Sequence, residues 1–231
     1  MENEEPEEKG LEEREKLQEK RSWKHLAISI VIVLAVFVSV FLLFSLTKDD
    51  ERPLTLDELH QLNYQGELDE EQGYIWNGNS FVNVGNTWFV TIKKGENLFS
   101  IPLHYGPREV IDVPMIRRNN TFGESEDFYF TFDPDDPKMG FITLASTEIG
   151  VTLAQVFLIA PKPACTSDID PACEGVAIGS CDLNGSVFYV RTADKPSVTV
   201  EDQCAIIEGD EWDLVRAADR FLLVIYGLME P

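Results

Sequence analysis

A stretch of 23 residues without Asp, Glu, Lys or Arg constrains this chain more than any other feature of its sequence. Residues 25–47 read HLAISIVIVLAVFVSVFLLFSLT. At about 1.5 Å of rise per residue, a helix of this length spans roughly 34 Å and can cross a hydrocarbon core of about 30 Å. A single segment in lipid satisfies its backbone polar groups only as a helix. The sequence therefore predicts a transmembrane helix over residues 25–47, with the lipid bilayer as its partner.

A cleaved secretory signal peptide is the alternative interpretation of this segment. Its apolar run exceeds the roughly 7–15 residues of a signal core, and no Ala-x-Ala cleavage pattern follows it. The sequence TKDDERP follows Leu46 and is typical of an interface where a span stops. We therefore interpret the segment as a signal anchor that stays in the protein.

The basic residues beside the span predict its orientation, because cytoplasmic flanks are enriched in Lys and Arg. The preceding basic residues are Lys16, Lys20, Arg21 and Lys24, and the following ones are Lys48 and Arg52. We expect a single-pass protein of the cell membrane with a cytoplasmic N-terminus. Residues 1–24 form a charged cytoplasmic arm, 48–72 a juxtamembrane helix and linker, and 73–231 an external domain.

The charge of the chain excludes one class of partner. Its 41 acidic and 19 basic residues give a formal net charge of −22. Nucleic acid binding requires clustered Lys and Arg to replace counterions, so no nucleic acid partner is expected. The acidic surface also opposes contact with anionic lipid and favours cationic partners or metal ions. A solvated surface that keeps the protein soluble, or a salt-rich habitat, explains the same charge.

Local patterns in the external domain predict both helices and strands. Thr55 and Glu58 have the spacing of a capping box at the start of a helix that ends near Asn63. From Tyr74 onward, aromatic and β-branched runs alternate with Asn-Gly, Gly-Asn and Lys-Gly turn signals. We expect strands at 74–76, 80–84, 87–93, 97–102, 127–132, 140–145, 176–180, 186–192, 197–201 and 204–208.

Two further segments have helical periodicity. Apolar residues recur at helical spacing over Thr147–Ala160, and Pro161 stops that helix. Near the C-terminus, Leu214, Ala217, Ala218, Phe221, Leu222 and Ile225 form one apolar stripe. The helix that carries the stripe is capped by Asp210, ends at Gly227, and has Arg216, Asp219 and Arg220 on a polar, solvated face. The predicted fold is α+β: an N-terminal transmembrane helix, then a mainly antiparallel β external domain with a mid-domain helix and a C-terminal amphipathic helix.

The four cysteines, Cys165, Cys173, Cys181 and Cys204, all lie in the external domain. Four cysteines allow three disulfide connectivities, among which the sequence does not choose rigorously. The favoured pairing joins Cys165 to Cys173 and Cys181 to Cys204, which suits an oxidising exterior. A zinc site and a thiol redox centre are weaker alternatives, because the chain has no Cys-x-x-Cys.

Candidate chemistry is sparse. His104 lies close to Arg108 and Glu109, and a histidine in such company can act as a general acid or base, although an ordinary loop histidine explains it as well. No nucleophile elbow and no phosphate-binding loop occurs, and no cofactor is expected.

The acidic turn of Asp133, Asp135 and Asp136 is a weak candidate for a metal site. It lacks the regular ligand spacing of a calcium loop, so a simple turn between strands explains it better. Asn119 and Asn184 begin Asn-x-Ser/Thr sequons and are candidate glycosylation sites of an external domain.

Three stretches carry a resemblance: Trp76–Val110, the paired-cysteine segment around Ala164–Cys181, and Cys204–Met229. Together they resemble a group of uncharacterised archaeal single-span membrane proteins with a four-cysteine external domain. The resemblance implies an archaeal source and a location in the envelope, and it transfers no functional residue.

These observations lead to one expected function and two alternatives. We expect a membrane-anchored, extracytoplasmic, non-enzymatic domain that binds an envelope or membrane protein partner. The first alternative is an anchored hydrolase that uses His104 with a carboxylate such as Glu109 or Asp133. The second is an accessory subunit of a membrane complex that uses the apolar span itself. A pocket that gathers His104, Arg108 and an acid within hydrogen-bond reach favours the hydrolase, whereas a flat apolar patch favours binding.

Overall fold

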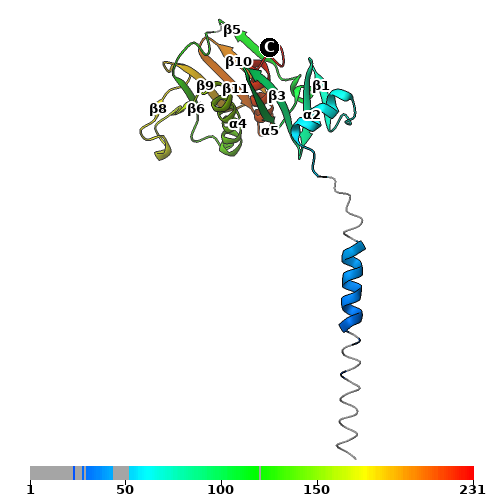
Figure 1. Cartoon of the computed structure of the whole chain (residues 1–231). Helices are drawn as coiled ribbons and strands as arrows, with labels where there is room; N and C mark the ends of the chain where they lie inside the picture. The colour runs from blue at the N-terminus through cyan, green and yellow to red at the C-terminus, as the bar shows by residue number, and fades with distance from the viewer. Residues whose placement is uncertain (1–22, 24–27, 29, 44–51, 120) are drawn as a thin grey trace, which may run out of the picture. The chain divides into compact units, whose positions relative to one another are not determined.

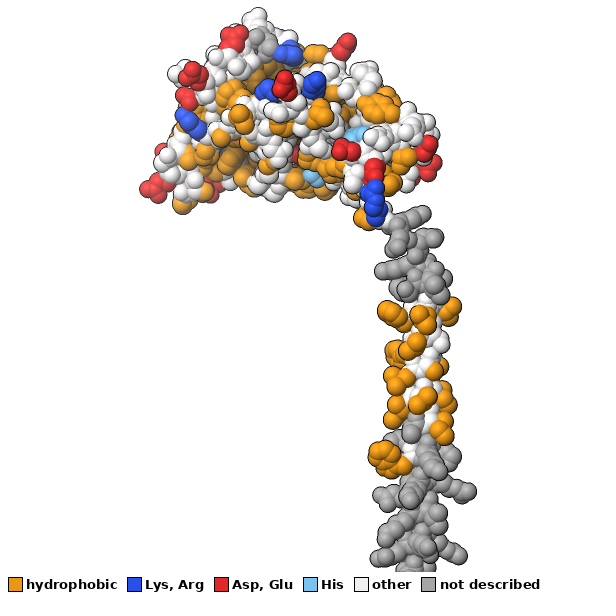
Figure 2. Space-filling view, viewed as in Figure 1, with side chains coloured by type: hydrophobic (Ala, Val, Ile, Leu, Met, Phe, Trp, Pro, Cys, Tyr) orange, Lys and Arg blue, Asp and Glu red, His pale blue; other side chains and the backbone are white. Residues whose placement is uncertain are grey.

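The computed structural model describes residues 23, 28, 30–43, 52–119 and 121–231 and divides the chain into two units, Met1–Pro53 and Leu54–Pro231 (Figure 1). In the first unit, residues Ile30–Leu43 form an apolar helix. Hydrophobic side chains surround its described part (Figure 2). This helix covers the middle of the predicted span, and both ends of that span lie outside the described residues.

Strands β1 to β4 form a four-stranded antiparallel sheet at the start of the second unit. The strands are β1 (Gly73–Trp76), β2 (Asn79–Val84), β3 (Thr87–Lys94) and β4 (Asn97–Leu103). Two-residue turns connect them, and Asn77, Gly78, Gly85 and Asn86 have positive φ in those turns. Because Asn and Gly tolerate this conformation, the turn signals predicted this sheet correctly.

Helix α2 (Leu56–Gln65) lies against β1 and β2 of this sheet. Thr55 and Glu58 form the predicted capping box, and Gly66 ends the helix in the left-handed conformation. Beneath the helix, Asn63 donates hydrogen bonds to the hydroxyl of Ser80 and to the carbonyl groups of Tyr74 and Phe81. The helix is therefore fixed to the sheet by buried polar contacts.

A second, seven-stranded sheet has the order β5-β10-β11-β9-β6-β7-β8. Its strands are β5 (Met115–Arg118), β6 (Phe128–Phe132), β7 (Lys162–Cys165), β8 (Ala177–Ile178), β9 (Ser186–Thr192), β10 (Ser197–Glu201) and β11 (Cys204–Gly209). Only β10 and β11 pair antiparallel, whereas every other neighbouring pair is parallel. The α+β class is confirmed, but the expectation of a mainly antiparallel domain holds for the first sheet alone.

The segment between β6 and β7 explains the parallel pairing. Parallel neighbours require a crossover connection, and α4 (Met139–Phe157) supplies it. The predicted strand at 140–145 is therefore wrong, and the predicted helix at 147–160 starts earlier than expected. The β-branched and aromatic residues of this segment favour a strand locally, but burial of Ile142, Ala145 and Ile149 along one helical face decides its conformation.

Helix α4 packs against α5 (Trp212–Ile225), and both lie on the seven-stranded sheet, α4 against β9 and α5 against β10 and β11. The predicted end of α5 at Gly227 is confirmed by its positive φ, but Glu211 stands at the N-cap in place of Asp210. Among the described helices, α4 is the one with the length and apolarity to cross a membrane. Six of its residues are buried in this domain, so it is a core helix here.

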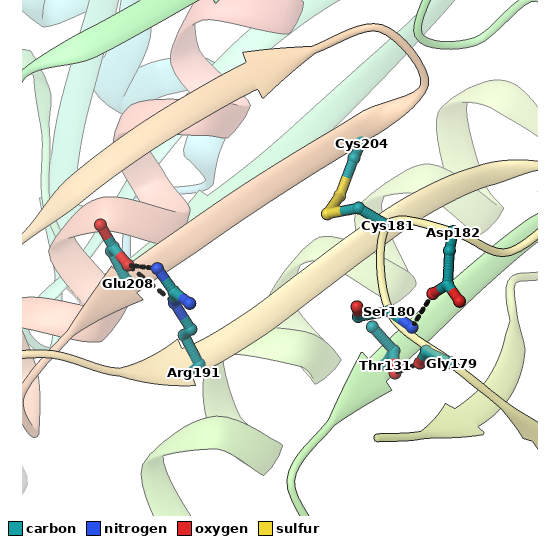
Figure 3. Close-up of a disulfide and its surroundings, with 8 residues drawn as sticks. All are labelled: Thr131, Gly179, Ser180, Cys181, Asp182, Arg191, Cys204 and Glu208. Atoms are coloured by element: carbon teal, nitrogen blue, oxygen red, sulfur yellow. Dashed lines mark hydrogen bonds and ion pairs between the residues drawn. A yellow bond between two sulfur atoms is a disulfide. The ribbon is translucent and has the colours of Figure 1, made fainter. Parts of the chain in front are cut away.

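Two disulfides fix the segments that flank the short strands. Cys165 at the end of β7 is bonded to Cys173 in the short helix η1 (Pro171–Cys173), and Cys181 is bonded to Cys204 at the start of β11. The favoured pairing is therefore confirmed. Figure 3 shows the Cys181–Cys204 bond near the hydrogen bond that Thr131 on β6 donates to the carbonyl of Gly179. The Cys181–Cys204 disulfide thus ties the loop after β8 to β11.

Candidate functional site

Three acid–base side chains from separate elements meet at one place in the second unit. His104 directly follows β4, Glu148 lies in the middle of α4, and Asp219 lies in the middle of α5. A ring nitrogen of His104 and one carboxylate oxygen from each acid all lie within 4.8 Å of one another. Within the part of the chain that the structure describes, no other group of three His, Cys, Asp or Glu residues gathers so closely. We call these three residues the His-Glu-Asp cluster.

The histidine and the glutamate of the cluster form a direct pair. The Nδ1 atom of His104 lies 2.5 Å from Oε1 of Glu148, and the backbone N–H of His104 donates to the same oxygen at 3.3 Å. The side chain of His104 is 36% exposed, whereas that of Glu148 is 10% exposed. His104 is therefore the member of the pair that solvent and a ligand can reach.

Asp219 occupies the deepest position in the cluster. It is fully buried, and its Oδ2 atom accepts a hydrogen bond of 2.7 Å from the backbone N–H of Tyr105. The expected solvated polar face of α5 is therefore wrong for Asp219 and for the buried Arg220. The α3 helix (Pro107–Val110) packs against α5, and Arg220 contacts Met229 and the carbonyl of Glu230 near the C-terminus.

Both carboxylates hold their protons more tightly than exposed acids do. Burial raises the pKa of Asp219 well above its ordinary value, and the neighbouring Glu148 raises it further, while the backbone amides of Tyr105 and His104 lower it. Burial also raises the pKa of Glu148, although the His104 ring opposes that shift. Because two like charges in a buried site repel each other, the cluster favours a proton or another cation between its carboxylates.

Two oxygen atoms of the cluster have no hydrogen-bond partner among the described residues. They are Oε2 of Glu148 and Oδ1 of Asp219, and both are buried. A buried polar atom without a partner costs about 1–3 kcal/mol. Imidazole nitrogen and carboxylate oxygen are also ligand types that Zn²⁺ accepts. The arrangement is suited to proton transfer or to holding a divalent cation.

Two cavities flank His104. One has a volume of about 410 Å³ and is lined by Trp88, Tyr105 and Trp212, among others. The other has a volume of about 320 Å³ and extends along α4 past Glu148. The ring centroids of His104 and Trp212 are 5.9 Å apart. A small ligand in either cavity would therefore reach the histidine and, through it, the cluster.

A further groove runs along α4 and shares Thr147 and Val151 with the cavity of about 320 Å³. It has a volume of about 520 Å³ and a largely apolar lining from β6, α4 and the segment before β7. Its lining residues are Phe130, Phe132, Met139, Ile142, Thr143, Ser146, Thr147, Gly150, Val151, Ala154, Ala160 and Pro161. We call this feature the α4 groove. Val151 and Ala154 on its wall are exposed.

The residues that the sequence placed beside His104 point to other partners. Arg108 pairs with Glu70 at 3.2 Å and lies over the ring of Tyr74, with its guanidinium carbon 4.2 Å from the ring centroid. Glu109 accepts a 2.5 Å hydrogen bond from the backbone N–H of Gly106. The acid that pairs with His104 is therefore Glu148 and not Glu109.

The acidic turn and the sequons occupy surface positions. The Asp133 carboxylate accepts a hydrogen bond from the backbone N–H of Asp135. The Asp136 carboxylate accepts hydrogen bonds from the backbone N–H of Lys138 and the hydroxyl of Thr192, so these two acids hold the turn and its neighbours in place. The three carboxylates do not form a close cluster. Asn119 and Asn184 are exposed, and their glycosylation stays a prediction.

The sequence analysis did not single out Glu148, and it assigned Asp219 to a solvated helix face, because no local signal shows that either residue lies near His104. Glu148 is 44 residues from His104 in sequence, and Asp219 is 114 residues from Tyr105. Glu148 lies within an otherwise apolar helical segment, whereas Asp219 lies beside Arg216 and Arg220 on the polar positions of α5. Neither position becomes informative until the packing of α4 against α5 is known.

The chain was compared with protein-family models, with curated proteins and with solved structures. These comparisons found no match.

Proposed function

We propose that this protein is a membrane-anchored extracytoplasmic binding protein whose α4 groove receives an apolar helix of a membrane protein partner. The span over residues 25–47 anchors the chain, and the domain from Leu54 onward carries the groove. The cell membrane, with a cytoplasmic N-terminus, is the proposed location. The two disulfides support an oxidising exterior for the domain.

The observation that carries this proposal is a stripe of small side chains in an open apolar groove. Ser146, Gly150 and Ala154 are spaced four residues apart on α4, and all three line the α4 groove. Small residues at this spacing let a second helix backbone approach closely, as in helix pairs of membrane proteins. Phe130 and Phe132 of β6 also line the groove, and the ring of Phe130 lies 3.3 Å from the position that a Cβ of Gly150 would take. Such a surface suits a helix with small and apolar side chains.

The charge of the domain favours a protein over the lipid surface as the occupant. Residues 1–24 contribute −3 (nine Glu, six Lys or Arg) and residues 48–53 contribute −1, so residues 54–231 contribute −18 of the total −22. An anionic bilayer surface repels such a domain. A partner helix with Lys or Arg at its end avoids that penalty. Tethering raises the effective concentration of the domain for membrane proteins nearby.

Substitution in the groove tests this proposal. Ala154→Lys places a charge in the groove without breaking helix α4, because both residues form helices well. Gln155→Lys is the matched control, because Gln155 is the next residue, is exposed and does not line the groove. Both variants are purified from membranes in mild detergent, and associated proteins are identified by mass spectrometry.

We expect a specific membrane protein to accompany the wild type and the Gln155→Lys variant and to be lost from the Ala154→Lys variant. Equal recovery with all three proteins would contradict the groove as the binding site. Replacing residues 25–47 by poly-Leu tests the accessory-subunit alternative. Loss of the partner from that variant would mean that the span itself recognises the partner.

An anchored hydrolase is the second candidate, and the pairing of His104 with Glu148 beside two cavities favours it. A histidine held by a carboxylate can accept a proton from water or from a substrate hydroxyl. Turnover of ester, amide or glycoside probes that His104→Ala abolishes would support the hydrolase. Retention of the partner by the same variant would show that binding does not depend on that chemistry.

A further inference from the structure

We propose that His104, Glu148 and Asp219 bind one divalent transition-metal ion of the Zn²⁺ class. The three residues contribute one imidazole from the residue after β4 and two carboxylates from α4 and α5. Three protein ligands of this kind leave one position of a tetrahedral ion for water or a small ligand. This inference is independent of the proposed helix partner, because none of the three residues lines the α4 groove.

The first support is the distance between the donor atoms. Ligands at about 2.0–2.2 Å from a tetrahedral ion stand roughly 3.3–3.6 Å apart. The donor atoms of the cluster lie within 4.8 Å of one another, and the closest pair, His104 and Glu148, is 2.5 Å apart. Shifts of about 1 Å therefore convert this geometry into a coordination shell, and small side-chain rotations supply such shifts.

The second support is the pair of unsatisfied oxygens. Oε2 of Glu148 and Oδ1 of Asp219 are buried without a hydrogen-bond partner among the described residues. Asp219 is fully buried, so its free oxygen does not reach solvent. A cation between the carboxylates satisfies both atoms and offsets the repulsion between the two acids.

The third support is the supply of positive charge around the cluster. His104 offers at most one positive charge to two carboxylates. The neighbouring cation on α5, Arg216, pairs with Asp112 and Asp213 instead. A divalent ion neutralises both carboxylates with the histidine in its neutral, metal-binding form.

The remaining contacts hold the ligands in place. The backbone N–H of Tyr105 donates to Oδ2 of Asp219 at 2.7 Å, and that of His104 donates to Oε1 of Glu148 at 3.3 Å. Such hydrogen bonds orient metal ligands and are worth about 10–100-fold in metal affinity. The cavities beside His104 give an ion access from solvent.

Direct metal analysis of the full-length protein in detergent tests the proposal. The protein is treated with EDTA, dialysed, and titrated with Zn²⁺ and with Mn²⁺ by calorimetry, and its bound metal is counted by mass spectrometry. Glu148→Gln and Asp219→Asn keep the size of each side chain and remove its charge. Asp135→Asn is the matched control, because Asp135 is an exposed acid outside the cluster.

We expect one Zn²⁺ per wild-type chain, unchanged stoichiometry in Asp135→Asn, and at least a tenfold loss of affinity in each of the other two variants. Near-UV circular dichroism verifies that the variants are folded. If the wild type binds no ion after titration, or if Glu148→Gln and Asp219→Asn bind it as tightly as the wild type, the cluster is not a metal site.

Discussion

The two sheets of the domain are held together in different ways. The four-stranded sheet joins neighbours in sequence through two-residue turns, and its pairing is antiparallel throughout. The seven-stranded sheet mostly joins strands that are far apart in sequence, with the β10–β11 pair as the exception. Helix α4 supplies the crossover from β6 to β7, and two disulfides link segments of this sheet. The first sheet is therefore specified locally, whereas the second is specified by packing and covalent bonds. The His-Glu-Asp cluster lies where β4, from the first sheet, meets the two helices that cover the second.

The largest expected loss of stability comes from a core substitution at the centre of the seven-stranded sheet. Phe188 on β9 is buried, and its ring lies within 6.3 Å, centroid to centroid, of the rings of Phe122, Phe128, Phe130 and Phe221. Phe188→Ala should lower the free energy of unfolding by about 3–5 kcal/mol, because it leaves a cavity among those rings. Urea denaturation measures this loss.

Hydrogen exchange on the same variant tests whether the two sheets are separate. We expect β6, β9 and β11 to lose protection before β1–β4 do. Equal loss in both sheets would mean that they unfold as one unit, and the distinction between them would then concern only how each is specified.

The next effect in size comes from the disulfides, which act on the seven-stranded sheet alone. Replacing Cys181 and Cys204 by Ser opens a bond between residues 23 positions apart, and we expect a loss of about 3 kcal/mol. Replacing Cys165 and Cys173 opens a loop of only 8 positions, and the loss should be smaller, about 2.5 kcal/mol. The reverse order in denaturation midpoints would show that strain or local packing outweighs loop closure.

A substitution in a turn of the four-stranded sheet should lower the free energy of unfolding by less than loss of either disulfide does. Gly78 has a φ of 79°, and an added Cβ there meets no atom within 4 Å, so Gly78→Ala introduces backbone strain alone. We expect a loss of about 1 kcal/mol.

Gly140→Ala is the matched control for this change. Gly140 is equally uncrowded but lies in α4 without a positive φ. Alanine should stabilise that position by about 0.5–1 kcal/mol. If thermal denaturation shows the same sign for both substitutions, the local account of the turn is wrong.

The smallest expected effect depends on pH and belongs to the four-stranded sheet. His60 is buried beneath α2, where its Nδ1 atom lies 2.9 Å from the hydroxyl of Ser80. Burial lowers the pKa of His60 below its ordinary value of 6.5, and Asp57 opposes that shift. At this residue the folded domain binds fewer protons than the unfolded chain in mild acid, so the contribution of His60 to stability falls as the pH drops below about 6.5.

His60→Gln removes this titration. Denaturation midpoints at pH 7.5 and 5.5 should differ less in the variant than in the wild type. An equal pH dependence in both proteins would assign the change to other groups.

The same contrast explains what the sequence predicted. The turns at Gly78 and Gly85, the capping box at Thr55 and the amphipathic stripe of α5 are local signals, and the structure confirms each of them. The start of α4 was read as a strand, because its preference for a helix arises from burial against α5. Strand β7 contains Pro163 and pairs only with distant strands, so no local pattern revealed it.

The candidate site was predictable only in part for the same reason. His104 was identified because Arg108 and Glu109 lie close to it in the sequence. Its partners Glu148 and Asp219 come from two helices whose approach depends on the whole fold. A sequence pattern shows which residues share a helical face, but it does not show which helix covers that face.

Site-specific photo-crosslinking in native membranes tests whether the α4 groove receives a helix of a partner protein. A photoreactive residue replaces Val151 on the wall of the α4 groove or, as a control, the exposed Gln155 outside it. We predict that Val151 crosslinks to a segment of a membrane protein and that Gln155 does not. Crosslinks from Val151 to lipid alone, to a second copy of this chain, or at the same level as from Gln155 would contradict the proposed docking of a partner helix.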